Sequence, residues 1–373
     1  MSRSPDVVVV GGGIIGIAVA ASCAQRGLRV TLCEAAGLAG AASGRNQGLV
    51  IGPHLPAVES IGRRTLELFL DLHERSGQAF AFDRGPHGCL ILSPEGGAVL
   101  SAAELRAAEP LLAPHIEYAE LNLDARRIDP GAAAAVLADE ARAAGAEIRT
   151  GCAVRELLRR GDDVTGVLTD DGRIEAQHVV VAAGPWSWRV CRSLPHDVPV
   201  RGVRGWILVT RPAPFRLRHA IEEEWTRPAP PAPTLAQLAE GTEPEPYVAC
   251  VLQQDFAGRV LIGSSLHGAT SDADESPETL TAIAQRAVAV MPALAGLAIA
   301  ERRSCQRPYS PDQLPLIGPY PGADGLILAT GHGSVGVTLS LGSGEAVAAG
   351  ITRGTWNRAL LPERLLEPST PAR

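Results

Sequence analysis

The sequence predicts a mixed α/β and α+β fold, in which a discontinuous Rossmann-like nucleotide-binding domain carries an inserted antiparallel-sheet domain. Three observations support this prediction. The first 34 residues read as strand, helix and strand; residues 178–181 and 326–330 read as further buried strands; and the chain from Val200 to about residue 300 reads as strands with long connections. At roughly 100–200 residues per domain, a chain of 373 residues has room for two domains.

The N-terminal segment carries the most specific motif. Asp6 precedes a run of four valines, which is typical of a buried parallel strand, and the glycine-rich segment Gly11–Gly16 follows it directly. A helix is predicted from Ile17 to Gly27, and a second strand from Leu28 to Cys33 ends in Glu34. This βαβ unit contains GxGxxG and an acidic residue about 20 positions further on, which indicates dinucleotide binding. The alternative is a glycine-rich turn with a structural role only.

Each position of this motif has a physical role. Gly11 allows the tight turn, Gly13 lets the backbone approach a pyrophosphate, and Gly16 lets helix and strand pack closely. The helix N-terminus attracts the diphosphate, and Glu34 can accept hydrogen bonds from ribose hydroxyls. The residues of this unit that we expect to bind the nucleotide are Gly11, Gly13, Ile14, Ile15, Gly16, Glu34 and Ala35.

Composition excludes several classes of function. All 34 basic residues are arginine, so chemistry that requires a lysine is excluded. The net charge of −7 and the lack of a basic stripe argue against nucleic-acid binding. The seven cysteines are scattered and form no CxxC pair, so we expect a reduced, cytoplasmic protein without a metal site. No signal peptide is apparent, and the uncharged stretch Gly325–Gly344 contains six glycines, so we expect no transmembrane segment.

Signals of the nucleotide-binding domain recur at the start, the middle and the end of the chain. We therefore assign residues 1–82, 128–200 and 300–373 to that domain, and residues 83–127 and 201–299 to the inserted one. The segment Arg227–Pro246, rich in Pro and Glu, reads as a surface excursion. The remaining predicted elements are helices at 56–78, 131–144 and 280–291, strands at 85–92, 147–150, 164–169, 178–181 and 326–330, a hairpin turn at 171–172, and a helix from about residue 338.

Four further segments, in this order along the chain, carry a family resemblance: Ala41–Gly48, Val154 on the strand after the helix 131–144, Ala183–Trp186, and Gly331–Thr338. The chain resembles the FAD-dependent D-amino acid oxidase-like superfamily, which includes glycine oxidase, the sarcosine oxidases, and D-amino acid and hydroxyproline dehydrogenases. The resemblance implies FAD as cofactor, an FAD-binding domain and a substrate-binding domain. By resemblance, the residues along the cofactor are Ala42, Ser43, Asn46, Gln47, Gly48, Val154, Ala183, Gly184, Trp186, Gly333, Ser334, Val335, Gly336, Val337 and Thr338.

The segment Arg307–Asp312, followed by Pro315–Gly318, resembles the family segment whose arginine binds the substrate carboxylate. An arginine suits this task because its planar fork binds a carboxylate bidentately and stays charged when partly buried. The alternative is an arginine paired with a local carboxylate such as Asp312. We also place Arg307 beside the flavin, and we take Tyr247 and His54 as further candidates for the catalytic site.

The chain departs from the family at four positions. Ser334 stands where glycine oxidase has a second arginine, Val251 where it has a tyrosine, and Leu266 where it has a methionine. Leu261 stands near the position of a lysine that activates oxygen in monomeric sarcosine oxidase. These departures argue against glycine as the substrate and against a fast reaction with oxygen of the sarcosine-oxidase type.

Cys305 lies seven residues before Asp312, the spacing at which monomeric sarcosine oxidase-like enzymes carry an 8α-S-cysteinyl flavin. The resemblance thus allows a covalent flavin at Cys305. The alternative is a small buried residue beside a flavin that is bound without a covalent bond.

The resemblance implies an enzyme that oxidises the C–N bond of an amino acid or secondary amine to an imine by hydride transfer to flavin N5. Its partners would be the small substrate and either oxygen or another electron acceptor. One alternative is a dehydrogenase subunit that passes electrons to a partner protein. Another is a flavoprotein subunit that mainly positions a partner and has no turnover of its own.

Overall fold

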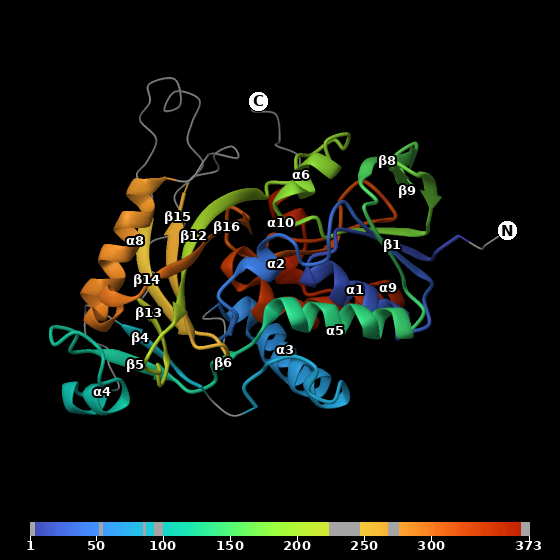
Figure 1. The fold of residues 1–373 in the computed structure, drawn as a ribbon. Helices are drawn as coiled ribbons and strands as arrows, with labels where there is room; N and C mark the ends of the chain where they lie inside the picture. Colours follow the sequence, from blue (N-terminus) through green and yellow to red (C-terminus); the bar gives the residue numbers. More distant parts are fainter. Residues whose placement is uncertain are drawn as a thin grey trace, which may run out of the picture.

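The computed structural model describes residues 4–51, 55–84, 87–92, 100–223, 247–267 and 276–366. Two large sheets dominate the fold, and Figure 1 shows them side by side. His54 and the segment 227–246 lie outside the described residues.

The first sheet has six strands in the order β17-β18-β11-β1-β2-β7, all parallel except the antiparallel edge strand β17. The four valines of β1 are buried because strands flank it on both sides and other layers cover both faces of the sheet. The strands are β1 (Val7–Val10), β2 (Val30–Glu34), β7 (Glu147–Thr150), β11 (His178–Val181), β17 (Leu316–Pro319) and β18 (Leu326–Thr330).

Helices cover one face of this sheet and a smaller sheet covers the other. The helices are α1 (Ile14–Ala24), α3 (Pro56–Arg75), α5 (Pro130–Ala143) and α9 (Gly336–Arg353). The smaller sheet contains β8 (Val154–Arg160), β9 (Asp163–Thr169) and β10 (Gly172–Glu175). Helices α1 and α9 pack closely, because a Cβ at Gly344 would lie 2.5 Å from the backbone of Ala18.

The second sheet has seven strands in the order β16-β12-β15-β14-β13-β4-β5, and neighbours are antiparallel except for β13 and β4. Helix α8 (Pro277–Val290) packs on one face. The strands are β4 (Cys89–Leu92), β5 (Ala119–Asn122), β12 (Arg201–Pro212), β13 (Ala220–Glu223), β14 (Tyr247–Gln254), β15 (Arg259–Leu266) and β16 (Ile299–Tyr309).

Short elements connect the two sheets and complete the chain. A two-stranded ribbon pairs β3 with β6. The remaining elements are α2 (Ala42–Arg45), β3 (Leu49–Val50), α4 (Ala102–Ala108), β6 (Arg126–Arg127), η1 (Gly184–Trp186), α6 (Ser187–Val190), η2 (Pro292–Gly296), η3 (Gly333–Val335), η4 (Arg358–Leu360) and α10 (Glu363–Leu366).

The predicted α/β and antiparallel parts are both present, but several predicted limits differ by a few residues, and two of the differences bear on the site. Helix α1 begins at Ile14 rather than Ile17, since Gly13 is the extended residue that caps it. The predicted boundary at residue 300 separates β16 from its own sheet, because β16 pairs with β12 along most of its length. Residues 300–309 therefore belong with the seven-stranded sheet. The other domain limits remain predictions.

One helical segment, Gly333–Arg353, is long and apolar enough to cross a membrane by length and composition. More than half of it is buried inside the protein, where α9 packs against α1 and α3. Such burial is also what a core helix of a water-soluble domain shows, so the segment by itself is weak evidence for a membrane span.

Candidate active site

A cavity of about 920 Å³ runs from the carboxyl ends of the parallel strands to one face of the seven-stranded sheet. Strand β1 is followed by β2 on one side and bordered by β11 on the other, so the strand order reverses at β1. Open α/β sheets bind ligands outside the carboxyl ends of their strands at such a switch point. The volume lies at the upper end of the roughly 300–1,000 Å³ range of ligand pockets.

The glycine-rich turn after β1 forms one wall of this cavity. Gly11 has φ +109°, and a Cβ there would lie 2.6 Å from the carbonyl oxygen of Ala182. Gly16 does not line the cavity; a Cβ there would lie 1.9 Å from the carbonyl oxygen of Gly11. Gly16 therefore lets the helix start directly beneath the turn, as the motif predicts.

Gly13 was predicted to let the backbone approach the pyrophosphate, but like Gly16 it does not line the cavity. A Cβ at Gly13 would lie 3.1 Å from the Ser43 hydroxyl oxygen. Gly13 thus gives room first to the side chain of Ser43, which lies at the cavity wall.

Glu34 closes the end of the cavity beside β2. Its carboxylate accepts hydrogen bonds from the backbone amides of Gly12 at 2.6 Å and Ala36 at 2.8 Å. These bonds fix the carboxylate at the cavity wall. A carboxylate offers about four acceptor sites, so the Glu34 carboxylate can accept further hydrogen bonds from a ligand. A ribose with its hydroxyls can supply them.

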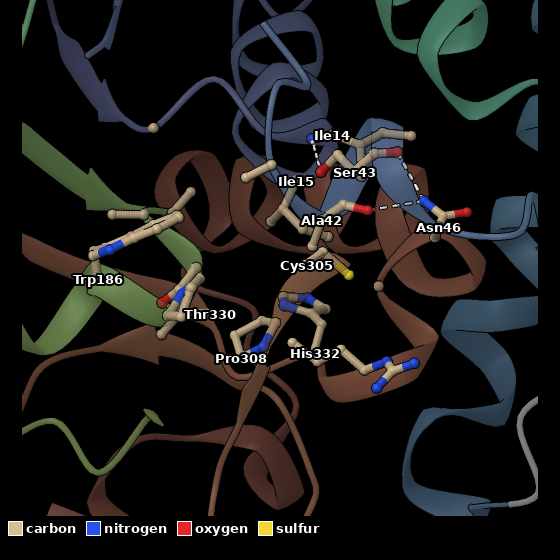
Figure 2. A pocket seen from close by; sticks show the side chains of 18 of the residues that line it. Ile14, Ile15, Ala42, Ser43, Asn46, Trp186, Cys305, Pro308, Thr330 and His332 are labelled. Atoms are coloured by element: carbon tan, nitrogen blue, oxygen red, sulfur yellow. Dashed lines mark hydrogen bonds between the residues drawn. The ribbon is translucent and has the colours of Figure 1, made fainter. Parts of the chain in front are cut away.

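The segment 42–48 is held against the start of α1 by side-chain hydrogen bonds (Figure 2). The amide of Ile14 donates to the Ser43 hydroxyl at 2.9 Å. The Asn46 side-chain amide donates to the carbonyl oxygens of Ala42 and Ser43, and the amide of Gly48 donates to the Asn46 side-chain oxygen. The first backbone amides of a helix have no partner within it, so this rigid wall places donors beside the cavity.

A second helix start lies on the opposite wall. Strand β18 leads through η3 into α9, and the residues Gly333–Thr338 line the cavity there. The Tyr309 hydroxyl lies 2.5 Å from the Ser334 hydroxyl and so fixes this loop to β16. Two helix N-termini therefore face one cavity, and both favour negative charge.

His332 lies directly before η3, at the start of this second loop, and also lines the cavity. It is almost fully buried, and its Nε2 lies 3.0 Å from the Ser343 hydroxyl. Burial lowers the pKa of His332 to about 3, so the imidazole is neutral in the folded protein at ordinary pH.

Acid should therefore destabilise the fold through His332. The unfolded chain, with a histidine pKa of about 6.5, takes up a proton that the folded chain refuses. The free energy of unfolding then falls as the pH drops from about 6.5 toward the folded pKa, by up to about 1.4 kcal/mol per pH unit. Urea unfolding at pH 7.5 and pH 5 measures the loss, which His332→Asn should reduce by about 2 kcal/mol. The exposed His115, changed to Asn, should leave it unaltered; an unchanged loss in His332→Asn contradicts the prediction.

Arg307 brings a positive charge into the cavity from β16. Its Nη1 donates to the carbonyl oxygen of Ser265 at 2.9 Å and its Nη2 donates to the Ser264 hydroxyl. The guanidinium lies against Gly205, where a Cβ would come within 2.1 Å of Nη1. These contacts hold the group in one position and leave N–H donors over, since a guanidinium has five.

The alternative role for Arg307, an ion pair with Asp312, is wrong. Asp312 instead pairs with Arg364, at 2.7 Å between Oδ2 and Nε. In the described part of the chain, no carboxylate lies within 4.0 Å of the Arg307 guanidinium nitrogens as an ion-pair partner. The cation is available for an anion that enters the cavity.

Cys305 also lines the cavity, two residues before Arg307 on β16 (Figure 2). It is the only one of the seven cysteines that is half-buried; the other six are buried. Both interpretations of Cys305, flavin attachment and packing beside the flavin, are compatible with this position.

The structure brings most of the predicted residues together, but Tyr247 does not line the cavity. Tyr247 lies at the start of β14, and the next residue of that strand to reach the cavity is Val251. The predicted residues that line the cavity are Gly11, Ile14, Ile15, Glu34, Ala35, Ala42, Ser43, Asn46, Gln47, Gly48, Val154, Ala183, Gly184, Trp186, Cys305, Arg307, Gly333, Ser334, Val335, Gly336, Val337 and Thr338.

Sequence reasoning missed most of the part of the cavity that strands β12, β13 and β15 form. Ile207, Glu222 and Ser264 line it there, and Ile51 is a further lining residue that was not predicted. The residues on these strands alternate between two faces, and only the register shows which face is inward.

Comparisons with known proteins agree with this geometry. The family model described as FAD dependent oxidoreductase (DAO) matches residues 6–349. The chain belongs to this family of FAD-dependent oxidoreductases. A glycine oxidase of Pseudomonas putida is 29% identical over 363 residues, which cover 90% of this chain and 92% of that protein. The hydrogen cyanide synthase subunit HcnC of Pseudomonas aeruginosa is 26% identical over 404 residues, covering 91% of this chain and 90% of that protein.

Two solved structures show the same fold. The L-proline dehydrogenase from P. horikoshii superposes with a TM-score of 0.82 at 22% identity, covering 98% of each chain. Glycine oxidase from Bacillus cereus superposes with a TM-score of 0.80 at 24% identity, covering 95% of this chain and 97% of that one.

The residues present fit the FAD that the family uses. A turn without side chains, two helix starts and a fixed carboxylate at one end match a pyrophosphate that joins a ribose to a second ring system. A Cβ at Gly11 would obstruct the turn, which explains the glycine there.

Proposed function

We propose that the enzyme oxidises the C–N bond of an amino acid or a secondary amine that bears a carboxylate, giving an imine. The observation that carries the proposal is Arg307, a fixed cation in the cavity without a carboxylate partner in the described chain. The names of similar proteins, among them glycine oxidase and 4-methylaminobutanoate oxidase, support an amine substrate with a carboxylate.

We propose further that the cofactor lies along the whole cavity. Its ADP half would run from Val154 and Glu34 past the turn at Gly11 to Ser43. Its flavin would lie between Gln47, the Gly333–Thr338 loop and β16. The amides at the start of α9 would stabilise negative charge on the flavin ring.

The chemistry that FAD would supply when bound is to accept a hydride from the carbon atom that carries the nitrogen. The chain's contribution is to position that carbon. Arg307 binds the carboxylate, so that one C–H bond is presented in a fixed direction. Ile207, Val251 and Ile51 form an apolar wall that displaces water from the reacting carbon. An amine that enters deprotonated needs no general base, and the imine released hydrolyses in water.

The test of this function is anaerobic bleaching of the bound flavin by a panel of D-amino acids, N-methyl amino acids, cyclic imino acids and opines. We expect at least one carboxylate-bearing amine to bleach the yellow absorption. If only amines without a carboxylate bleach it, the proposed substrate class is wrong.

A second candidate is a dehydrogenase subunit that passes electrons to a partner protein. One relative, HcnC, is named as a subunit, which favours this alternative. Oxygen consumption compared with dye reduction by the isolated chain separates the two. Rapid dye reduction without oxygen uptake supports a partner as the acceptor, and lack of any turnover supports a subunit with a positioning role.

The flavin should be bound without a covalent bond to Cys305. Acid denaturation is expected to release free FAD into the supernatant, and Cys305→Ala should retain the flavin content of the unchanged protein. Cys250→Ala, on a buried cysteine outside the cavity, is the control for a cysteine change as such. A peptide that carries the flavin mass at Cys305 would show that the thiol forms the linkage.

A further inference from the structure

We infer that the side-chain oxygen of Gln47 accepts a hydrogen bond from the substrate nitrogen, at the C–N bond that is oxidised. The inference rests on the proposed function, because it assigns a second substrate contact in the same cavity. It implies that the substrate is a primary or secondary amine, since the nitrogen must carry a hydrogen. Its basis is the way in which the seven-stranded sheet holds the Gln47 amide.

The nitrogen of the Gln47 side chain is fully used by the sheet. Nε2 donates to the carbonyl oxygen of Val251 on β14 at 2.9 Å and to that of Leu261 on β15 at 3.3 Å. A side-chain amide has two N–H donors, and these two bonds use both. Because backbone carbonyls only accept, the NH2 group of the amide must face them and the oxygen must face away. The amide is therefore fixed in one orientation.

The amide occupies a place that a missing side chain leaves open. A Cβ at Gly263 would lie 3.2 Å from Nε2 and 3.3 Å from Oε1 of Gln47. Gly263 pairs with Ile207 of β12 and with Val251 of β14, and both of these residues line the cavity, as Gln47 does. Residues directly opposite each other in a sheet point to the same face. A polar amide thus stands between apolar side chains in the cavity wall.

The oxygen of this amide has no partner in the part of the chain that the structure describes. Both hydrogen bonds of the half-buried Gln47 side chain involve Nε2, and neither involves Oε1. The polar side-chain atoms that are buried without a partner do not include Oε1. Oε1 is therefore accessible, and the space beside Gln47 is the cavity. A ligand in the cavity meets a fixed hydrogen-bond acceptor there.

Arg307 lies beside this acceptor. Its guanidinium donates to the hydroxyl of Ser264 and to the carbonyl oxygen of Ser265, the two residues that follow Gly263. A donor group for a carboxylate and an acceptor for an N–H group therefore contact three consecutive residues of β15. The two groups match the two polar ends of an amino acid, in which the nitrogen and the carboxylate are attached to one carbon atom.

An acceptor suits the substrate nitrogen better than a donor does. As the carbon loses a hydride, the lone pair of the nitrogen forms the C=N bond, and positive charge develops on the nitrogen. A donor would bind the lone pair, whereas Oε1 binds the N–H and leaves the lone pair free. The hydrogen bond becomes charge-assisted as the charge develops, so it stabilises the transition state more than the bound amine. Transfer of the N–H proton to water then gives the imine.

Two carboxylates without a C–N bond test the acceptor in the absence of amine oxidation. 2-Hydroxypropanoate can donate to Oε1, and 2-fluoropropanoate, of similar size, cannot. Titration of the flavin absorption measures the affinity of each enantiomer. The unchanged enzyme should bind one enantiomer of the hydroxy acid about threefold to tenfold more tightly than the fluoro acid, as expected for a neutral hydrogen bond. Gln47→Met, which removes the acceptor, should abolish this preference and leave the affinity for the fluoro acid within about twofold.

Turnover should be more sensitive to Gln47 than binding is. Because the hydrogen bond gains charge in the transition state, Gln47→Met should lower kcat/KM for N-methyl amino acids by about tenfold to a hundredfold, with much of the loss in kcat. N,N-Dimethyl amino acids that enter deprotonated have no N–H. They should be poor substrates of the unchanged enzyme, and any flavin reduction by them should change by no more than about twofold in the variant. Anaerobic flavin reduction measures both.

Gln253 provides the matched control. Its side chain donates to the carbonyl oxygen of Gly48 at 2.7 Å and so holds the same loop on the same sheet, but it does not line the cavity. Gln253→Met should change the affinities for both carboxylates by one common factor and keep the preference for the hydroxy acid. If Gln47→Met also changes both affinities equally, Gln47 only holds the loop, and the inference is wrong.

The flavin itself gives a further readout. Its midpoint potential and its absorption without ligand should be the same in Gln47→Met as in the unchanged enzyme. A shifted potential with an intact preference for the hydroxy acid would mean that Oε1 binds the flavin, which overturns the inference. If Gln47→Met releases its flavin, Gln47→Leu removes the same acceptor with a different shape.

The unchanged enzyme alone separates the inference from the proposed function. Equal affinity for the hydroxy and fluoro acids, or N,N-dimethyl amino acids as the best substrates, overturns the role of Gln47. Flavin bleaching by carboxylate-bearing amines would then still uphold the proposed function, whereas bleaching by no such amine would contradict that function itself.

Discussion

Replacement of Arg307 by alanine is expected to lower kcat/KM for a carboxylate-bearing substrate by about tenfold to several hundredfold. A hydrogen bond between charged groups contributes about 1.5–3 kcal/mol, and a bidentate pair lies at or beyond the upper value. About 1.4 kcal/mol corresponds to one factor of ten in kcat/KM. Arg307→Lys should restore only part of the loss, because an ammonium cannot reproduce the planar fork held by Ser264 and Ser265.

Arg303→Ala is the control for this experiment. Arg303 lies on the same strand, but it pairs with Glu301 at 2.8 Å and does not line the cavity. Flavin content should be unchanged in all three variants, which separates a substrate contact from a structural role. If Arg307→Ala instead unfolds or loses FAD, and an amine without a carboxylate is the best substrate, the protein belongs among amine oxidases rather than amino acid oxidases.

The second large effect is expected at Gly16. Gly16→Val should abolish FAD binding and lower the free energy of unfolding by about 1–3 kcal/mol or more, the usual cost of overpacking. The reason is the 1.9 Å between a Cβ at this position and the carbonyl oxygen of Gly11. Relief of that clash must shift either the turn at Gly11 or the start of α1, and both form the phosphate-binding wall. Flavin absorbance per protein and urea unfolding are the measurements.

Gly131→Val is the matched control for Gly16→Val. Gly131 also lies in the first turn of a helix, α5, but a Cβ there would meet only the Asp129 carboxylate at an ordinary 3.6 Å. This variant should keep its flavin. A Gly16→Val protein that is yellow and as stable as the control would refute the packing role assigned to Gly16. Replacement of Gly13 by valine should also give apoprotein, because the added side chain would displace the side chain of Ser43.

The parts of the fold that the sequence predicts correctly are those with local signals. The βαβ unit at the N-terminus depends on a valine run, a glycine turn and an alanine-rich helix, and all three are adjacent in the chain. The substrate wall depends on the pairing of strands far apart in sequence. The resemblance places Val251 at the position of a family tyrosine, and Tyr247 was a second candidate on the same strand; the structure shows that Val251 lines the cavity and Tyr247 does not.

Arg307 illustrates both sides of this difference. The family resemblance is sufficient to select it, because the Arg-Pro-Tyr segment is local. The sequence alone could not exclude Asp312 as its partner, because Asp312 is bound by Arg364, which lies 52 residues further along the chain. Glu222 carried no local signal, because in the run Glu222–Glu224 the sequence does not show which side chain faces the cavity until the neighbouring strands are placed.

The close packing of α1 against α9 has a consequence for synthesis of the chain on the ribosome. The backbone of Ala18 receives Gly344 directly, and the loop before α9 supplies the wall opposite the glycine turn. A nascent chain therefore leaves the side of its first helix that receives α9 uncovered until more than 300 further residues have emerged. Domains usually fold as units during synthesis, and surface left uncovered in the meantime promotes aggregation. The cofactor cannot be enclosed by a partly made chain, so its supply should affect the yield of folded protein late in synthesis rather than early.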